Sequence, residues 1–258
     1  LLPELFERPY FCQEKRYDYY DYALPLTENP AVRRFQAIAG ELGVVIPVSF
    51  YERDVQRLFN SIAMIDADGS ILGVYRKTHI PDDHFYQEKF YFTPGDIGFK
   101  PINTSVGRLG VQVCWDQWFP EGARLMALQG ADMLIYPTAI GYEPGDLKEE
   151  QERQREAWIT VQRGHAVANG LPVISVNRTG YESASSGNGN GIQFWGSSFV
   201  CGPQGEILSQ ASQDKEENLL VEINLTRSEH VRRWWPYLRD RRIDKFEGLL
   251  ERFIDTKP

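Results

Sequence analysis

Short apolar segments alternate with amphipathic helical segments along most of this 258-residue chain. Apolar residues at helical spacing predict helices over 30–42, 120–129 and 147–169, and a glycine follows each of them. Runs of β-branched and apolar residues predict strands at 44–51, 60–65, 71–76, 109–113, 133–136, 173–177, 199–201, 206–209 and 219–223. Short strands interleaved with helices indicate sheets whose outer faces are covered by helices, and the absence of a linker predicts one domain over 1–258.

Two hairpin signals in the chain resemble each other. Residues 64–72 read MIDADGSIL and residues 200–208 read VCGPQGEIL, so each has a glycine followed two residues later by Ile-Leu. The likeness is either one that hairpins share in general or a sign of a sandwich built from two related halves. Residues 95–103 and 183–193 carry little order signal, and the second stretch is rich in Gly, Ser and Asn, which predicts a flexible loop or lid.

The balance of charges argues against several classes of partner. The chain has 28 basic and 36 acidic residues, a formal net charge of −8, whereas nucleic-acid binding needs a concentrated basic face. No segment approaches the roughly 20 consecutive apolar residues of a spanning helix, so no membrane partner is expected. The three cysteines are widely spaced, which predicts neither a disulfide framework nor a Cys-x-x-Cys metal site and favours a reducing, cytoplasmic compartment.

Cys114 is the sharpest candidate for chemistry. It ends a predicted strand a few residues before a predicted helix, a placement that exposes a side chain and leaves backbone N–H groups free to bind an oxyanion. An inert core cysteine is the alternative. A nucleophilic cysteine needs a neighbouring base or cation, usually a histidine, and of the four histidines in the chain His165 and His230 have no neighbourhood that suggests catalysis. His79 and His84 flank two aspartates at a spacing that is not a zinc pattern, so no metal is expected.

Four separated segments resemble signatures of the nitrilase superfamily of carbon–nitrogen hydrolases. They are residues 2–5 (LPEL), 75–81 (YRKTHIP), 87–96 (QEKFYFTPGD) and 110–116 (GVQVCWD). The resemblance implies a four-layer αββα sandwich, in which the two similar hairpins would fit. It also implies that Glu4, Lys77 and Cys114 form a catalytic triad, with Glu88 as a second glutamate. Members of the family have a strand and a helix before the first glutamate, so the domain over 1–258 would lack these elements.

The resemblance implies a covalent mechanism that needs no cofactor and no metal. Glu4 would take the proton of the Cys114 thiol, and Lys77 would stabilise the thiolate and the oxyanion. The N–H of Trp115 would be the second oxyanion donor, and Glu88 would orient the substrate amide or the lysine. Taken singly, each residue could be an ordinary surface group. Together they favour an enzyme over a catalytically inactive binding scaffold of the same fold.

Finer similarity points to the branch of that family that hydrolyses N-carbamoylputrescine to putrescine, ammonia and carbon dioxide. It lies in residues 114–121, 138–144 and 235–242. Asp116 and Glu143 are the expected partners of a cationic substrate tail, and Trp195 is an expected apolar wall beside a methylene chain. Related amidases acting on ω-amides or β-ureido acids stay open, because Arg178 could anchor a carboxylate.

The C-terminal region bears on assembly. Phe246, Leu249, Leu250 and Phe253 form an apolar stripe at helical spacing. Such a stripe must be buried against its own domain or against a neighbouring copy. Because the resemblance implies a homo-oligomer, we expect the neighbour.

Overall fold

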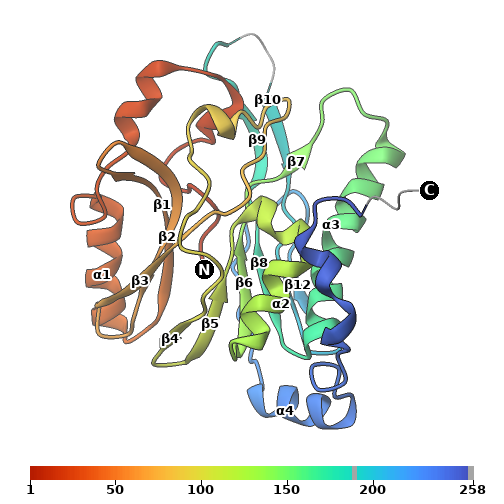
Figure 1. Cartoon of the computed structure of the whole chain (residues 1–258). Helices are drawn as coiled ribbons and strands as arrows, with labels where there is room; N and C mark the ends of the chain where they lie inside the picture. The colour runs from red at the N-terminus through yellow and green to blue at the C-terminus, as the bar shows by residue number, and fades with distance from the viewer. Residues whose placement is uncertain (188–190, 255–258) are drawn as a thin grey trace.

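The structure, a computed structural model, describes residues 1–187 and 191–254 as two face-to-face sheets with helices on both outer faces (Figure 1). The first sheet has the order β1-β2-β3, and the second has the order β12-β11-β8-β6-β5-β4. The first sheet and its helix are α1 (Pro30–Leu42), β1 (Ile46–Asp54), β2 (Arg57–Ile65) and β3 (Ile71–Arg76). The second sheet and its helices are β4 (Ile102–Thr104), β5 (Gly107–Val111), α2 (Pro120–Leu128), β6 (Met133–Pro137), α3 (Lys148–Asn169), β8 (Val173–Val176), β11 (Phe199–Cys201) and β12 (Ile207–Gln210).

The alternation of side chains along β2 explains the layers. Ala63 and Ile65 pack in the cluster that contains the buried face of α1. Ile62 and Met64 point to the opposite face and join the core that also contains residues of the second sheet and of α3. One strand therefore contributes to two apolar layers, and both faces of the first sheet are covered. The expected αββα sandwich is confirmed.

The two hairpins that resemble each other in sequence also correspond in structure. The β2–β3 hairpin has a register shift at Met64/Ile65, and the β11–β12 hairpin has one at Val200/Cys201. Their turns contain Gly69 at φ +83° and Gly205 at φ +76°, left-handed conformations that glycine adopts without a steric penalty. One hairpin lies in each sheet, and the two share a register shift and a glycine turn.

The structure corrects two expectations about secondary structure. Residues 219–223 form no strand: the side chain of Leu220 is fully exposed, and no neighbouring strand pairs with this segment. Residues 183–193 are not one loop, because β9 (Thr179–Ser183) and β10 (Gly191–Trp195) pair antiparallel across it, and 188–190 lie outside the described residues. With β7 (Gly141–Tyr142), these strands form a small third sheet in the order β7-β10-β9 that sequence analysis missed.

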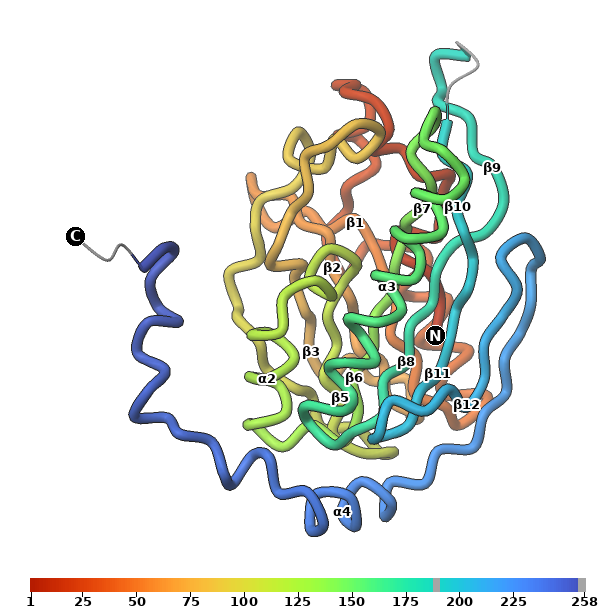
Figure 2. The backbone as a smooth tube through the Cα atoms, turned by 90° about the vertical axis from the view of Figure 1, so that its right-hand side faces the viewer, coloured from red at the N-terminus to blue at the C-terminus, as the bar shows by residue number. Residues whose placement is uncertain are grey.

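The remaining elements are short. They are η1 (Phe11–Gln13), η2 (Tyr17–Tyr22), η3 (Glu88–Phe90), η4 (Cys114–Trp118), α4 (Leu225–Trp234), η5 (Ile243–Lys245) and η6 (Glu247–Leu250). Figure 2 shows α4 below the body of the molecule and the chain after it rising at one side, next to α2, toward the C-terminus. The expected apolar stripe lies here on 3₁₀ turns rather than on a regular helix, and its side chains are exposed. Within the described residues, no helix is both long and apolar enough to cross a membrane.

Candidate active site

Cys114 lies just beyond the end of β5, at the first residue of η4. Its backbone has φ +44°, a left-handed conformation that costs a non-glycine residue about 1–3 kcal/mol and is often found at functional sites. The side chain is buried, with 3% of its surface exposed, and its Sγ lies 3.8 Å from the carbonyl oxygen of Ala139. The fold therefore holds the sulfur in a strained turn at the end of a parallel strand, as its place in the sequence predicted.

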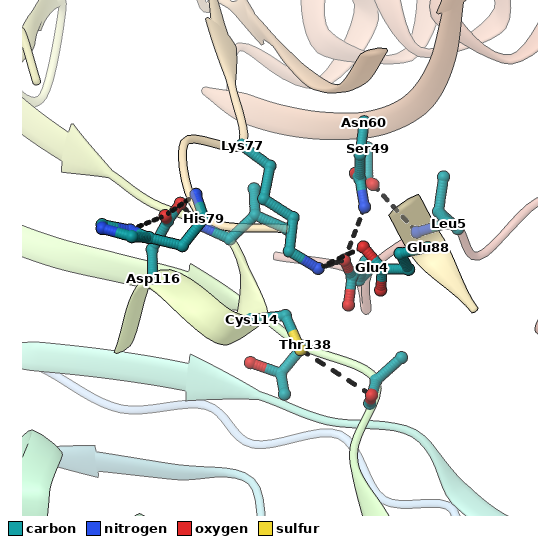
Figure 3. Close-up of polar contacts among 12 residues, drawn as sticks. Glu4, Leu5, Ser49, Asn60, Lys77, His79, Glu88, Cys114, Asp116 and Thr138 are labelled. Atoms are coloured by element: carbon teal, nitrogen blue, oxygen red, sulfur yellow. Dashed lines mark hydrogen bonds and ion pairs between the residues drawn. The ribbon is translucent and has the colours of Figure 1, made fainter. Parts of the chain in front are cut away.

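Three charged side chains lie together beside this cysteine (Figure 3). The Lys77 Nζ donates to Glu4 Oε1 at 2.8 Å and to Glu88 Oε2 at 2.6 Å. None of the three side chains has any exposed surface. Glu4 comes from the start of the chain, Lys77 follows β3 and Glu88 begins η3, so the fold brings together all four residues that the sequence predicted as catalytic.

Neutral donors fix the two carboxylates. The Asn60 Nδ2 donates to Glu4 Oε1 at 2.6 Å, and the Tyr10 hydroxyl donates to Glu88 Oε1 at 2.6 Å. The other oxygen of Glu4, Oε2, is buried and has no hydrogen-bond partner within the described residues. A buried carboxylate oxygen without a donor is costly, so it is the natural acceptor for a proton from a reacting group. Sequence analysis missed Tyr10 and Asn60, since neither belongs to a recognisable motif.

The charges of the cluster govern protonation. Burial would lower the pKa of Lys77, but the negative charges of Glu4 and Glu88 outweigh it and hold that pKa well above its ordinary value. Burial and the charge of Glu4 raise the pKa of the Cys114 thiol, against the opposing effect of Lys77. Burial also raises the pKa of Glu88 to about 7. The sulfur is therefore held as a thiol, and a base must take its proton when it attacks.

A pocket of about 490 Å³ opens above Cys114. Its walls include Trp115 and Trp195, and the buried indole Nε1 of Trp195 has no partner among the described residues. Three acidic residues, Asp83, Glu143 and Asp146, also line the pocket, and we call them the acidic mouth. The His84 Nδ1 lies 2.5 Å from Glu143 Oε1. The pocket thus combines a buried reactive floor, aromatic walls and a negatively charged opening.

Two sequence-based expectations about the pocket are corrected. Asp116 does not line it: the carboxylate is fully buried and accepts hydrogen bonds from Tyr75, His79 and Val113. Arg178 is also unavailable for a substrate carboxylate, because its guanidinium donates to three backbone carbonyl oxygens and to Glu182. Both residues have a full set of partners in their own chain. Of the two acidic residues expected to meet the substrate, only Glu143 lies at the pocket.

No group of three or more His, Cys, Asp or Glu side chains within residues 1–187 and 191–254 is placed to hold a metal ion. His165, buried in α3, uses its Nε2 to bind the backbone carbonyl of Gln117. His79 bonds to Asp116 and His84 to Glu143, so the two do not converge on one point.

Comparison with known proteins agrees with this geometry. The family model described as carbon-nitrogen hydrolase matches residues 1–233. An N-carbamoylputrescine amidase from Oryza sativa subsp. japonica is 50% identical over 97% of this chain and 82% of its own length. A citrullinase from Francisella tularensis is 42% identical over 98% of this chain and 86% of its own length.

A solved structure supports the same assignment. The crystal structure of a carbon-nitrogen hydrolase from Helicobacter pylori G27 superposes with a TM-score of 0.94 at 53% identity. The match covers 98% of this chain and 86% of that one. On the sequence match, the sandwich fold and the cysteine with its buried lysine and glutamates, the chain belongs to the carbon–nitrogen hydrolase family.

Proposed function

We propose that this protein is a cysteine-dependent amidohydrolase that cleaves N-carbamoylputrescine to putrescine, ammonia and carbon dioxide, a step of polyamine synthesis. The observation that carries the chemistry is the buried Lys77 ammonium between Glu4 and Glu88, beside Cys114, which lines the pocket. The similarity to N-carbamoylputrescine amidases supports the choice of substrate.

In the first half of the reaction, the Cys114 sulfur attacks the ureido carbonyl carbon while Glu4 takes the thiol proton on its free Oε2. The oxygen that becomes negative is stabilised by the Lys77 ammonium and by the N–H of Trp115. Glu4 then returns its proton to the departing nitrogen, and ammonia leaves. The product is a carbamoyl thioester on Cys114.

In the second half, water attacks the thioester carbon and Glu4 accepts one of its protons. The tetrahedral intermediate collapses with release of the sulfur, which regains its proton from Glu4. The carbamate product loses carbon dioxide to give the free amine. Glu88 holds Lys77 in place through the 2.6 Å ion pair, so that the cation serves both oxyanions. Every step uses this chain's own residues and water, and none requires a cofactor.

The acidic mouth favours a cationic substrate tail. Asp83, Glu143 and Asp146 present carboxylates at the opening, whereas no lysine or arginine among the described residues lines the pocket. A β-ureido acid would place its carboxylate against these charges. Trp115 and Trp195 provide apolar surface for the methylene chain between the two ends of the substrate.

The test is ammonia release from N-carbamoylputrescine, β-ureidopropionate, citrulline and glutaramate at equal concentrations. We expect N-carbamoylputrescine to give the highest kcat/KM. Faster turnover of β-ureidopropionate would disprove the polyamine assignment while leaving the cysteine mechanism intact. No turnover of any of them, with no covalent adduct on Cys114 by mass spectrometry, would favour an inactive scaffold.

We also propose that the protein is a homo-oligomer in a cytoplasmic, reducing compartment. Leu249, Leu250 and Phe253 are 64%, 93% and 79% exposed in a single copy, and a second copy would cover them. Cys12 and Cys201 are buried free thiols, as a reducing compartment favours. Sedimentation at micromolar concentration should give an oligomer, and truncation after 245 should yield smaller species. A monomer, or an unchanged truncated form, would contradict the proposed interface.

A further inference from the structure

The buried carboxylate of Asp116 joins the two segments that supply the nucleophile and the lysine. Its Oδ2 accepts hydrogen bonds from the Tyr75 hydroxyl at 2.7 Å and from the Val113 backbone N–H at 3.1 Å. Its Oδ1 accepts from the His79 backbone N–H at 2.9 Å and from the His79 Nδ1 at 2.7 Å. Figure 3 shows Asp116 and His79 beside Lys77 and Cys114, on the side away from Glu4.

The donors from Tyr75 and His79 to Asp116 lie on either side of Lys77 in the sequence. Tyr75, Lys77 and His79 are two residues apart; Tyr75 lies in β3, which ends at Arg76, and His79 lies in the bend that follows Lys77. Asp116 binds the two outer members and leaves the central ammonium free to meet Glu4 and Glu88. The lysine is therefore held on both sides along its own backbone.

The same carboxylate also supports the turn of the nucleophile. Val113, whose N–H it accepts, directly precedes Cys114, and Asp116 follows two residues later. Cys114 has the strained φ of +44°, which persists only where surrounding contacts hold it. The bond from Val113 to the carboxylate closes this turn.

His79 contributes a second attachment to the turn. Its ring stacks on Phe119, the residue that follows η4, with ring centroids 3.7 Å apart and planes 4° apart. Its Nδ1 lies 2.7 Å from Asp116 Oδ1, and in the tautomer with the proton on Nδ1 the ring donates this hydrogen bond. His79 thus contacts η4 at two points, one within the turn and one at its end.

We infer that Asp116 and His79 are positioning residues that set the place of the Lys77 ammonium relative to the Cys114 sulfur. The carboxylate of Asp116 is taken up by Tyr75, Val113 and His79, so both residues act on the site through other residues. The inference rests on the proposed catalytic roles of Lys77 and Cys114. It predicts that weakening this link changes the reactivity of the sulfur and the rate of the chemical step, with little change in substrate binding.

The test uses four variants. Asp116→Asn keeps the shape of the side chain but turns an acceptor into a donor facing Val113. His79→Phe keeps a ring to stack on Phe119 but removes the donor to Asp116, whereas His79→Asn keeps a donor at the position of Nδ1 and removes the ring. Asp132→Asn is the matched control, because Asp132 accepts a backbone N–H from Arg108 at the other end of β5.

The first readout is the pH dependence of Cys114 alkylation by iodoacetamide, followed by mass spectrometry of the Cys114 peptide, and it needs no substrate. The charged groups that act on this thiol are Glu4, Lys77 and Glu88. In Asp116→Asn and His79→Phe we expect alkylation to slow and its profile to move to higher pH, because the ammonium no longer stabilises the thiolate as well. His79→Asn and Asp132→Asn should keep the wild-type profile.

The second readout is steady-state turnover of N-carbamoylputrescine. In Asp116→Asn and His79→Phe we expect kcat to fall roughly tenfold, the usual effect of losing one hydrogen bond to a charged group. KM should change less than twofold, and His79→Asn should recover most of kcat. If the wild-type enzyme does not act on this substrate, the proposed function fails, while the alkylation profiles still decide the positioning role.

Several results would overturn the inference. One is a wild-type alkylation profile in both Asp116→Asn and His79→Phe. Another is an equal shift in Asp132→Asn, which would indicate a general effect of stability. A third is a His79→Asn profile as altered as that of His79→Phe, since the donor would then not matter. If Asp116→Asn does not fold, the two His79 variants decide the question by themselves.

Discussion

Two pairs of a basic and an acidic side chain are equally close but lie in different surroundings: one, which we call the floor, is buried beside Cys114 beneath the pocket lining, and the other lies on the pocket wall at the acidic mouth. At the floor, Lys77 Nζ lies 2.6 Å from Glu88 Oε2, and both side chains have no exposed surface. At the mouth, His84 Nδ1 lies 2.5 Å from Glu143 Oε1, with side chains 61% and 39% exposed. Close contact alone therefore does not determine what such a pair contributes.

The surroundings determine it. In the buried pair, the two charges interact in a medium of low dielectric. Removing either partner would leave the other charge buried without a counter-charge, at a large cost in desolvation free energy. The exposed pair is screened by water, and such pairs contribute only about 0–1 kcal/mol. We therefore expect the floor to tolerate no substitution, whereas the mouth can exchange His84 for the ammonium of a substrate. The following four changes test this contrast.

The largest effect is expected at Cys114. Cys114→Ser places a much weaker nucleophile in the same turn, and losing a covalent nucleophile typically costs a factor of about a thousand or more in kcat. Ammonia release from N-carbamoylputrescine measures it, and circular dichroism shows that the fold is kept. Activity above about one part in a thousand of the wild type would contradict a covalent role for this residue.

The next change tests whether the floor acts as one unit. Glu4→Gln and Lys77→Met should each remove most of kcat, and the double variant should be little worse than either alone, because residues that act together are strongly non-additive. The measurement is kcat for the three variants in parallel. Losses that multiply in the double variant would show that Glu4 and Lys77 act independently.

A smaller effect is expected at the mouth. Glu143→Gln should raise KM for N-carbamoylputrescine several-fold and leave kcat unchanged, since a half-exposed carboxylate attracts the distal ammonium but does not reach the reacting bond. KM for glutaramate, whose distal end is a carboxylate instead of an ammonium, should fall, because the substitution removes one repelling charge. Glu149→Gln is the control for loss of one charge, because Glu149 is exposed on the first turn of α3, away from the pocket wall. An equal rise in both variants would indicate only the general charge of the protein.

The smallest effect concerns stability and pH. Burial raises the pKa of Glu88 from 4.5 to about 7, so between these values the folded chain holds a proton that the unfolded chain has released. The stabilising contribution is present below 4.5 and is lost as pH rises through about 7. The free energy of unfolding of the wild type should therefore fall with pH across this window relative to Glu88→Gln. Urea denaturation at several pH values measures this, and parallel curves for the two proteins would show that Glu88 is already ionised at the lower end.

Local signals made much of the fold predictable. The helix over 30–42 was bounded correctly because the signals at its ends are local: the Asn29 side chain accepts from the Val32 N–H, Pro30 opens the helix, and Gly43 ends it at φ +65°. The Asp66–Gly69 turn likewise set the β2–β3 hairpin. The β7-β10-β9 sheet was missed, because β7 has only two residues, too few for a recognisable sequence pattern. It is a strand because it pairs with β10, about 50 residues later in the chain.

The rest of the fold and of the site depends on contacts between residues that are far apart in the sequence. The segment 219–223 has the composition of a strand, but it pairs with no strand among the described residues, and a strand forms only where such a partner is available. Tyr10 meets Glu88 across 78 residues of sequence, and Asn60 meets Glu4 across 56. No sequence pattern predicts either contact, because the two residues of each pair come together only when the layers of the sandwich pack.

From the sequence by itself, local periodicity and turn residues predicted the hairpins and most helices and strands, and the resemblance carried by the four motif segments implied the sandwich fold and the set Glu4, Lys77 and Cys114. Only the tertiary structure decided the role of the acidic residues. Asp116, next to the nucleophile in sequence, is turned inward to Tyr75 and His79, whereas Glu143, in a loop between two elements, reaches the pocket. The physical reason is that a carboxylate has the same charge everywhere along a chain, and the donors and the water that the fold places around it determine whether it supports the protein or binds a ligand.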